Sequence, residues 1–197
     1  HDNNGILAYN EREMIARTIR SLFEQSVFTG RGATLPDVQW EIIVVPNGCK
    51  DDTHQQAEQA LQQACANSKT PGVAWRVVSL ERAGKSHAWN KLVHEIAAPQ
   101  TDAFLMIDAD IEFGHLDTIA NSVQRLRSDD HAWAVVDMPL KDFHRKTDNT
   151  WFEKLSMRVS KRRLADSHAG IAGSFYVMSA ARMRSISTRP ASSSTGS

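Results

Sequence analysis

The chain has 197 residues, of which 41% are hydrophobic, and its 23 Lys and Arg balance its 23 Asp and Glu to a formal net charge of zero. This length suits one domain with its own core, and the neutral balance argues against a nucleic-acid partner, which basic surfaces attract. No segment reaches the ~18 consecutive apolar residues of a membrane span, and Cys49 and Cys65 are too few for a disulfide framework, so we expect a cytoplasmic protein.

Apolar segments of strand length alternate with amphipathic segments of helix length from the N-terminus onward. The pattern predicts strands over residues 5–9, 40–45, 73–79, 103–107 and 133–138. It predicts helices over 11–25 (with Asn10 as the cap), from Asp51 or Asp52 to 67, and over 86–97, 115–127 and 149–166. This alternation favours an α/β fold with a mostly parallel sheet covered by helices on both faces.

The two ends of the chain bear on its domain organisation. We expect residues 1–188 to form a single domain. The segment 189–197 is rich in Ser and of low complexity, and we predict that it is disordered. The first residue is His1 rather than Met, which together with this tail suggests a fragment whose domain is incomplete at its C-terminus.

Three of the predicted strands end in segments that carry polar side chains. These segments are Ala8-Tyr9-Asn10-Glu11, Asn47-Gly48 and Asp108-Ala109-Asp110. The carboxyl ends of parallel strands share one edge of a sheet, where ligands bind in open α/β folds, so we expect the segments to meet there. Tyr9 can line a base or ribose, and the polar side chains can hydrogen-bond to it. Gly48 allows the backbone to approach a ligand closely.

Each of these segments, taken alone, has a simpler structural interpretation. Asn-Gly is a turn signal, and Asn10 and Asp52 are residue types that cap helices. Taken alone, each segment is better explained as a turn or a helix cap than as part of a binding site. The three together on one edge of a sheet favour a nucleotide site.

Gly84-Lys85-Ser86 stands where the third helix is expected to begin. Free N–H groups at a helix start favour anions, and Lys85 adds a full positive charge. The segment lacks the first glycine and the spacer of a Walker A loop. An exposed Lys beside a Ser cap is an equally good interpretation of this segment alone.

Asp108 and Asp110 follow an apolar strand and offer hard oxygen ligands. Mg²⁺ and Mn²⁺ accept carboxylates together with substrate phosphates and water, so two protein carboxylates suffice. A cation at this place would neutralise charge on a departing diphosphate. The alternative is a helix cap, since Asp-x-Asp is frequent by chance.

The predicted helix 149–166 carries basic side chains beside apolar ones over residues 151–163. Such a helix can lie on an anionic membrane or bind a phosphate-bearing acceptor. Peripheral contact with the inner face of a membrane is therefore one possibility. A packed helix with a solvated basic face is the interpretation that the pattern favours.

The strand-end motifs, in their order and spacing, resemble those of family-2 glycosyltransferases of the GT-A fold. The resemblance is carried by four segments, which are Ala8-Tyr9-Asn10-Glu11, Ile42 to Thr53, Gly84 to Asn90 and Asp108-Ala109-Asp110, and it is close over residues 5–113. The segment 170–174 is similar to a later glycine-containing segment of the family on the acceptor side. The resemblance implies a three-layer α/β/α sandwich with a Rossmann-like nucleotide-binding half.

The resemblance also implies an activity and roles for residues. The activity is inverting transfer from a nucleotide-diphosphate sugar, most simply a UDP-sugar, to a hydroxyl of a carbohydrate or lipid-linked acceptor, as in polysaccharide biosynthesis. The implied donor-binding residues are Ala8, Tyr9, Asn10, Glu11, Asn47, Gly48, Lys85, Asn90, Asp108 and Ala109, and the implied ligands of Mg²⁺ or Mn²⁺ are Asp108 and Asp110. Tyr9, Asn10 and Glu11 would line the nucleoside pocket, with Asn47 near the base. Asp108 would lie near the ribose.

Two features depart from the family pattern. The family usually has an acidic residue in the pair that is here Pro46-Asn47, where it helps to read the nucleobase. The family's general base is a carboxylate beyond the segment that ends near Gly173, and no Asp or Glu follows Gly173 here. A non-catalytic nucleotide-sugar-binding or interaction module is therefore an alternative. A nucleotidyltransferase is a third hypothesis, although no glycine- and arginine-rich triphosphate loop follows the first strand.

Overall fold

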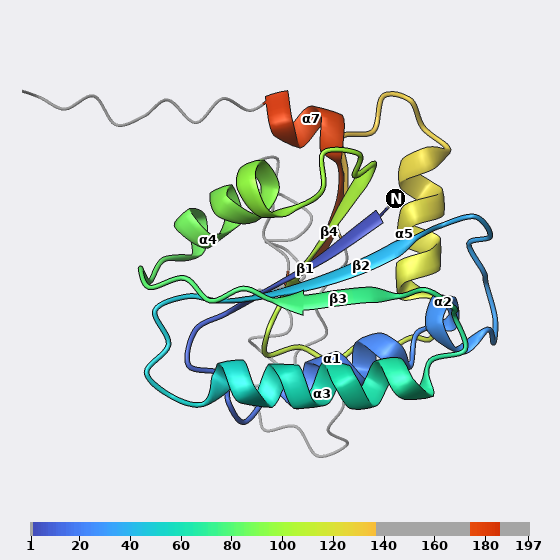
Figure 1. Cartoon of the computed structure of the whole chain (residues 1–197). Coiled ribbons are helices and arrows are strands. Elements are labelled where there is room, and N and C mark those ends of the chain that lie inside the picture. Colours follow the sequence, from blue (N-terminus) through green and yellow to red (C-terminus); the bar gives the residue numbers. More distant parts are fainter. Residues whose placement is uncertain (1, 137–173, 186–197) are drawn as a thin grey trace, which may run out of the picture.

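The computed structural model describes residues 2–136 and 174–185, which form one sheet between two layers of helices (Figure 1). The strands are β1 (Asp2–Ala8), β2 (Trp40–Pro46), β3 (Ala74–Val77), β4 (Ala103–Asp108), β5 (Ala134–Val136) and β6 (Phe175–Ser179). The helices are α1 (Ile15–Phe23), α2 (Ser26–Thr29), α3 (Thr53–Asn67), α4 (Lys85–Lys91), the π-helical turn η1 (Leu92–Ile96), α5 (Thr118–Arg127) and α7 (Ala180–Ser185).

The sheet has six strands in the order β3-β2-β1-β4-β6-β5. β1 pairs in parallel with both β2 and β4, and β2 pairs in parallel with β3. β6 runs antiparallel to β4 and to β5. The prediction of an α/β fold with a mostly parallel sheet is confirmed, and the carboxyl ends of β1, β2 and β4 lie along the same edge.

Each face of the sheet packs against its own helices, so the described residues form three layers. On one face, α1, α3 and α5 bury apolar side chains such as Ile19, Leu61 and Val123 against the sheet. On the other face, α4, η1 and α7 contribute Ala88, Leu92 and Met183 (Figure 1). β2 is buried over its whole length, which explains its continuous apolar sequence.

Several element boundaries differ from the sequence-based expectation. The first helix begins at Ile15 rather than Glu11, so Met14 and not Asn10 occupies its cap position. Asn10 has a left-handed backbone with φ of 53°. The third expected helix changes to a π-helical turn after Lys91. β6 and α7 were not predicted. The segment Phe175–Ser179 is as apolar as the other strands but is not followed by a turn, because α7 begins at the next residue.

Some predictions fall outside the described residues. These are the helix over 149–166 with its membrane contact over 151–163, the glycine-containing segment up to Gly173 and the tail 189–197. The extent of the single domain over 1–188 stays a prediction. Within the described part of the chain, no helix has the length and apolar character needed to cross a bilayer.

Candidate functional site

A pocket of about 390 Å³ opens at the edge where β1, β2 and β4 end. It is lined by Leu7, Ala8, Tyr9, Glu11, Asn47, Ala83, Gly84, Lys85, Asp108, Ala109 and Asp110. The structure therefore brings the three strand-end segments and the start of α4 together. Of the residues predicted from the sequence, Asn10, Gly48 and Asn90 do not line this pocket.

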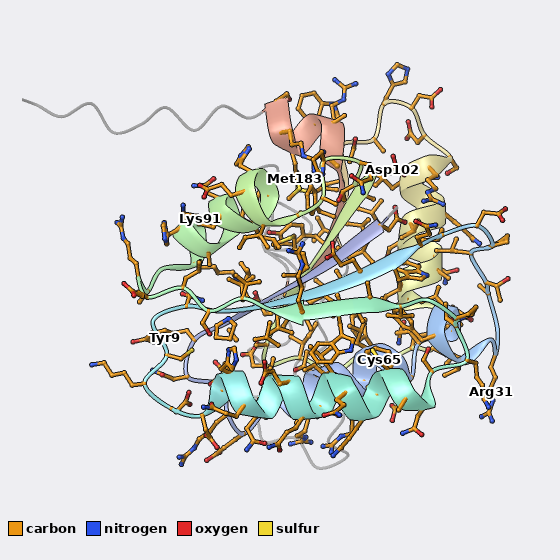
Figure 2. All side chains as sticks on the ribbon, in the orientation of Figure 1. Tyr9, Arg31, Cys65, Lys91, Asp102 and Met183 are labelled. Atoms are coloured by element: carbon orange, nitrogen blue, oxygen red, sulfur yellow. The ribbon has the colours of Figure 1, made fainter. Side chains whose placement is uncertain are left out.

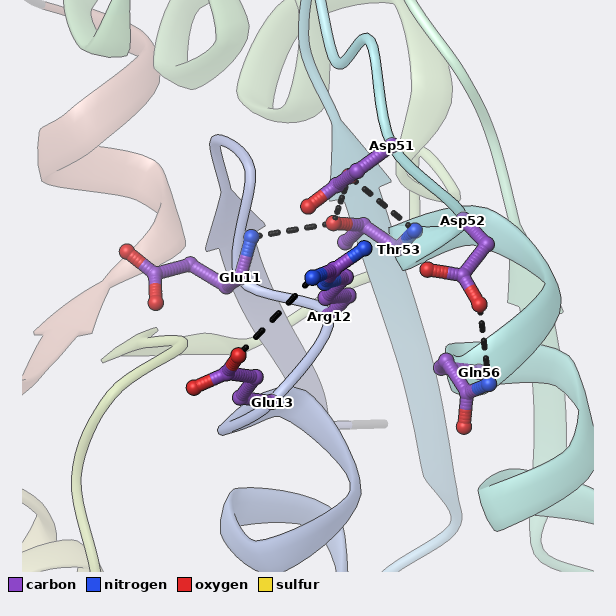
Figure 3. A network of polar contacts seen from close by, with 7 residues as sticks. All are labelled: Glu11, Arg12, Glu13, Asp51, Asp52, Thr53 and Gln56. Atoms are coloured by element: carbon purple, nitrogen blue, oxygen red, sulfur yellow. Dashed lines mark hydrogen bonds and ion pairs between the residues drawn. The ribbon is translucent and has the colours of Figure 1, made fainter.

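The segment after β1 forms one wall of the pocket. Tyr9 is 52% exposed and lies at one end of the molecule, opposite Arg31 (Figure 2). The backbone N–H of Glu11 donates to Thr53 Oγ1 at 2.9 Å, and Thr53 in turn donates to Asp51 Oδ1. This network ties the segment to the start of α3 and leaves the Glu11 carboxylate pointing away from Thr53 (Figure 3).

The Glu11 carboxyl lies in an acidic environment. Partial burial raises its pKa, and the carboxylates of Asp110, Asp51 and Asp108 raise it further. Like charges in one place disfavour ionisation, and a cation among them would relieve the repulsion. The carboxylates of Glu11, Asp108 and Asp110, which line the pocket, therefore favour the binding of a positively charged group.

Two of the three predicted residues outside the pocket lining, Asn10 and Gly48, have structural contacts of their own. The exposed Asn10 accepts a hydrogen bond from the Lys50 N–H at its Oδ1, at 2.9 Å. Gly48 has φ of 63°, and a Cβ there would stand 2.6 Å from the Ala83 backbone nitrogen, so this glycine permits two chain segments to pass closely. Asn90 lies on α4, and its buried Oδ1 has no hydrogen-bond partner among the described residues.

The start of α4 faces the end of β4 across the pocket. Lys85 Nζ lies 2.5 Å from Asp108 Oδ1. The Lys85 side chain is 62% exposed and that of Asp108 is 29% exposed, so both remain accessible to a ligand. A phosphate group entering between them would meet one cationic and one anionic wall.

Asp108 and Asp110 fit a divalent cation by their chemistry. Both line the pocket, and Asp110 is exposed. Within the described ranges, no group of three or more His, Cys, Asp or Glu could hold a metal ion. A cation at Asp108 and Asp110 would therefore complete its ligand set with water or with oxygens of a bound phosphate, as Mg²⁺ commonly does.

Helix α1 holds the segment that follows β4. Thr18 Oγ1 donates to the carbonyl oxygen of Ala109 at 2.8 Å in a buried position, and Ser21 Oγ accepts from the Phe113 N–H at 2.7 Å. Arg17 pairs with Glu112 at 2.8 Å. Sequence reasoning missed these supporting contacts. The available signal was that Thr18 and Ser21 lie on the otherwise apolar, buried face of this helix.

Residues 5–186 match the glycosyl transferase family 2, whereas a search of curated proteins found no significant match. Among solved structures, mannosyltransferase PcManGT from Pyrobaculum calidifontis, in complex with GDP-Man and Mn²⁺, is 22% identical with a TM-score of 0.57, over 90% of this chain and 44% of that one. Glucosyl-3-phosphoglycerate synthase from Mycobacterium tuberculosis, in complex with Mn²⁺, UDP and phosphoglyceric acid, is 20% identical with a TM-score of 0.54, over 92% and 56%. S. aureus TarS 1-349 is 15% identical with a TM-score of 0.58, over 94% and 49%.

The chain spans about half the length of these three structures. At such identities, the structural likeness establishes the fold, which is GT-A, and the sequence match establishes the family. Because the match extends over most of the chain, the protein belongs to glycosyl transferase family 2.

Proposed function

We propose that this protein transfers a sugar from a nucleotide-diphosphate sugar to an acceptor hydroxyl. The observation that carries the proposal is the pocket at the edge of the sheet, in which Lys85 pairs with Asp108. Asp110 and the segment after β1 line the same pocket. A nucleoside diphosphate needs a wall for its base and charged groups for its phosphates. The pocket offers both within one volume.

Each side of the pocket is assigned a part of the donor. Tyr9 and Glu11 face the nucleoside, with Asn10 between them in the chain. Asn47 lines the same pocket. Lys85 contacts the diphosphate and Asp108 the ribose. Binding in this way aligns the anomeric carbon for attack by an acceptor hydroxyl from the side opposite the diphosphate, with inversion. Ala8 and Ala109 line the pocket and are assigned contacts with the donor. Gly48 and Asn90 lie outside the lining and are assigned roles in supporting the donor site.

Asp110, together with Asp108, is proposed to hold Mg²⁺ or Mn²⁺. When bound, the cation neutralises charge on the leaving diphosphate. Two solved structures of the same fold contain Mn²⁺ with GDP-Man or with UDP, which supports a divalent cation and a donor of either base. One of them also contains phosphoglyceric acid, so an anionic acceptor is as admissible as a carbohydrate or lipid-linked one.

The test is release of UDP or GDP from a panel of nucleotide sugars, with Mn²⁺ or Mg²⁺ and candidate acceptors. The proposal expects release that depends on the cation and increases with one class of acceptor. Folded protein that binds nucleotide diphosphates but releases none from any sugar donor would contradict catalysis by this chain.

A second candidate function is nucleotide-sugar binding without turnover. The observation in its favour is the composition of residues 174–197, which include no Asp or Glu to act as the general base expected there. Donor binding without even slow hydrolysis would support this candidate over the first.

A further inference from the structure

The side chain of Asn47 connects two parts of the pocket that are distant in the sequence. Asn47 lies just after β2 and is 3% exposed. Its Nδ2 donates to the carbonyl oxygen of Ala8 at 2.7 Å, and its Oδ1 accepts from the Gly84 N–H at 2.9 Å. One buried amide therefore joins the end of β1 to the residue that precedes α4.

The two partners fix the orientation of this amide. The Ala8 carbonyl can only accept a hydrogen bond, and the Gly84 N–H can only donate one, so nitrogen must face Ala8 and oxygen must face Gly84. Both the nitrogen and the oxygen of Asn47 are thus engaged with backbone. A buried side chain used in this way is poorly placed to read a nucleobase.

The residue held by this amide immediately precedes Lys85. Gly84 has φ of 140°, a conformation open to glycine but rare for other residues. A Cβ placed there would meet only His87 Cβ, at 3.7 Å, among the described residues. The Gly84 carbonyl oxygen accepts from the Ala88 N–H at 2.9 Å in the first turn of α4. The Gly84 N–H is held by Asn47, so this hydrogen bond ties the start of α4 to the end of β2 at a position where side-chain packing restrains the chain little. The position of Gly84 decides from where the Lys85 side chain reaches into the pocket.

We infer that Asn47 is a positioning residue for Lys85 and not a reader of the base. It holds the Gly84 backbone so that the Lys85 ammonium meets the diphosphate. This inference rests on the proposed function, since it assigns Asn47 a part in diphosphate binding. Removal of the Asn47 amide should weaken the diphosphate contacts and leave the nucleoside contacts unchanged.

Calorimetry with uridine and UDP, and with guanosine and GDP, in the presence of Mn²⁺ separates the two kinds of contact. The quantity of interest is the ratio of the nucleoside Kd to the nucleoside-diphosphate Kd. We expect Lys85→Met to lower this ratio about ten- to a hundredfold and Asn47→Ala to lower it about tenfold. In the Lys85→Met background, Asn47→Ala should change the ratio less than about twofold, because its effect passes through Lys85.

Asn10→Gly is the matched control, because Asn10 is a strand-end asparagine whose amide contacts Lys50 and not Gly84. Its effect on the same ratio should be equal in the wild-type and Lys85→Met backgrounds. A measurement without ligand completes the design. Amide hydrogen exchange at Gly84 should be at least about tenfold faster in Asn47→Ala and unchanged in Lys85→Met.

Three results would overturn the positioning role while the proposed function stands. The first is that Asn47→Ala loses as much affinity for the nucleoside as for the nucleoside diphosphate. The second is that Asn47→Ala changes the Kd ratio as strongly in the Lys85→Met background as in the wild-type protein. The third is that Asn47→Ala leaves amide exchange at Gly84 unchanged. If the wild-type protein binds neither UDP nor GDP, the proposed function is overturned instead. The exchange rate then decides alone whether Asn47 holds the Gly84 backbone.

Discussion

Lys85 Nζ lies 2.5 Å from Asp108 Oδ1, so the cationic and anionic walls of the pocket are paired with each other. A divalent cation that binds without a donor must compete with this ammonium for Asp108. Lys85→Met should therefore increase the affinity for Mn²⁺ alone and decrease the affinity for UDP or GDP. Calorimetric titrations with each ligand measure the two changes. A parallel loss of both affinities would contradict the competition.

The carboxylate of Asp110 is the cation ligand that our proposal depends on most. Asp110→Asn keeps the size of the side chain and removes its charge. It should weaken Mn²⁺-dependent UDP or GDP binding by about ten- to a hundredfold, the usual effect of losing one charge-assisted contact. Asp130→Asn, at an exposed Asp outside the pocket lining, is the control. Equal binding by Asp110→Asn and wild type would refute the assignment.

Thr18 tests whether α1 supports the Asp108-Ala109-Asp110 segment. Thr18→Val is nearly isosteric and leaves the buried Ala109 carbonyl without its donor. We expect the free energy of unfolding to fall by about 1–3 kcal/mol, with weaker Mn²⁺ binding. The control is Thr118→Val, because the Thr118 hydroxyl donates in an exposed hydrogen bond to the His115 carbonyl, which keeps a second donor in Gln25 Nε2. Urea unfolding measures the free energy of unfolding of both variants. Equal losses in the two variants would contradict a supporting role for Thr18.

The Glu11 carboxyl should make the stability of the folded protein depend on pH. Burial, with Asp110, Asp51 and Asp108 nearby, raises the pKa of Glu11 in the folded protein. The folded state therefore binds this proton more tightly than the unfolded state, and stability should fall as pH rises through the pKa of Glu11. Glu11→Gln removes this contribution. The difference in Tm between Glu11→Gln and wild type should grow from low to neutral pH, and a constant difference would contradict the assignment.

The buried Asn4 in β1 offers a stabilising substitution. Its Oδ1 and Nδ2 have no hydrogen-bond partners among the described residues, and its neighbours across the sheet are Ile42 and Leu105. Asn4→Val should raise the free energy of unfolding by about 1–3 kcal/mol, because it removes unsatisfied polar groups from an apolar layer. Asn4→Asp should lower it. Chemical denaturation that shows both variants less stable than wild type would indicate an unrecognised partner for Asn4.

The sequence predicted the sheet well because its strands are local and apolar. β2 and β4 end within one residue of the expected positions, since Pro46 and the acidic pair after Ile107 mark the change from apolar to polar chain. The sequence did not predict the antiparallel β6, because no turn signal or helix spacing distinguishes Phe175–Ser179 from a short buried helix.

The candidate site was predictable as a set of strand ends but not as a set of contacts. That Ala8, Asn47 and Asp108 share an edge follows from parallel strands alone. The Asn47 amide forms hydrogen bonds with Ala8 and Gly84 because of the path that the chain takes between residues 77 and 85. No local sequence pattern predicts this path. Long-range contacts such as that of Thr18 with Ala109 also require the packed structure.

We expect the pocket between β1, β2, β4 and α4 to bind a nucleoside diphosphate together with a divalent cation. The most direct test is calorimetric titration of the folded wild-type protein with UDP and with GDP, each with and without Mn²⁺. At least one of the two nucleotides should bind saturably at one site per chain, and this binding should be strengthened by Mn²⁺ and weakened by Asp110→Asn. Folded protein that binds neither nucleotide, with or without the cation, would contradict it.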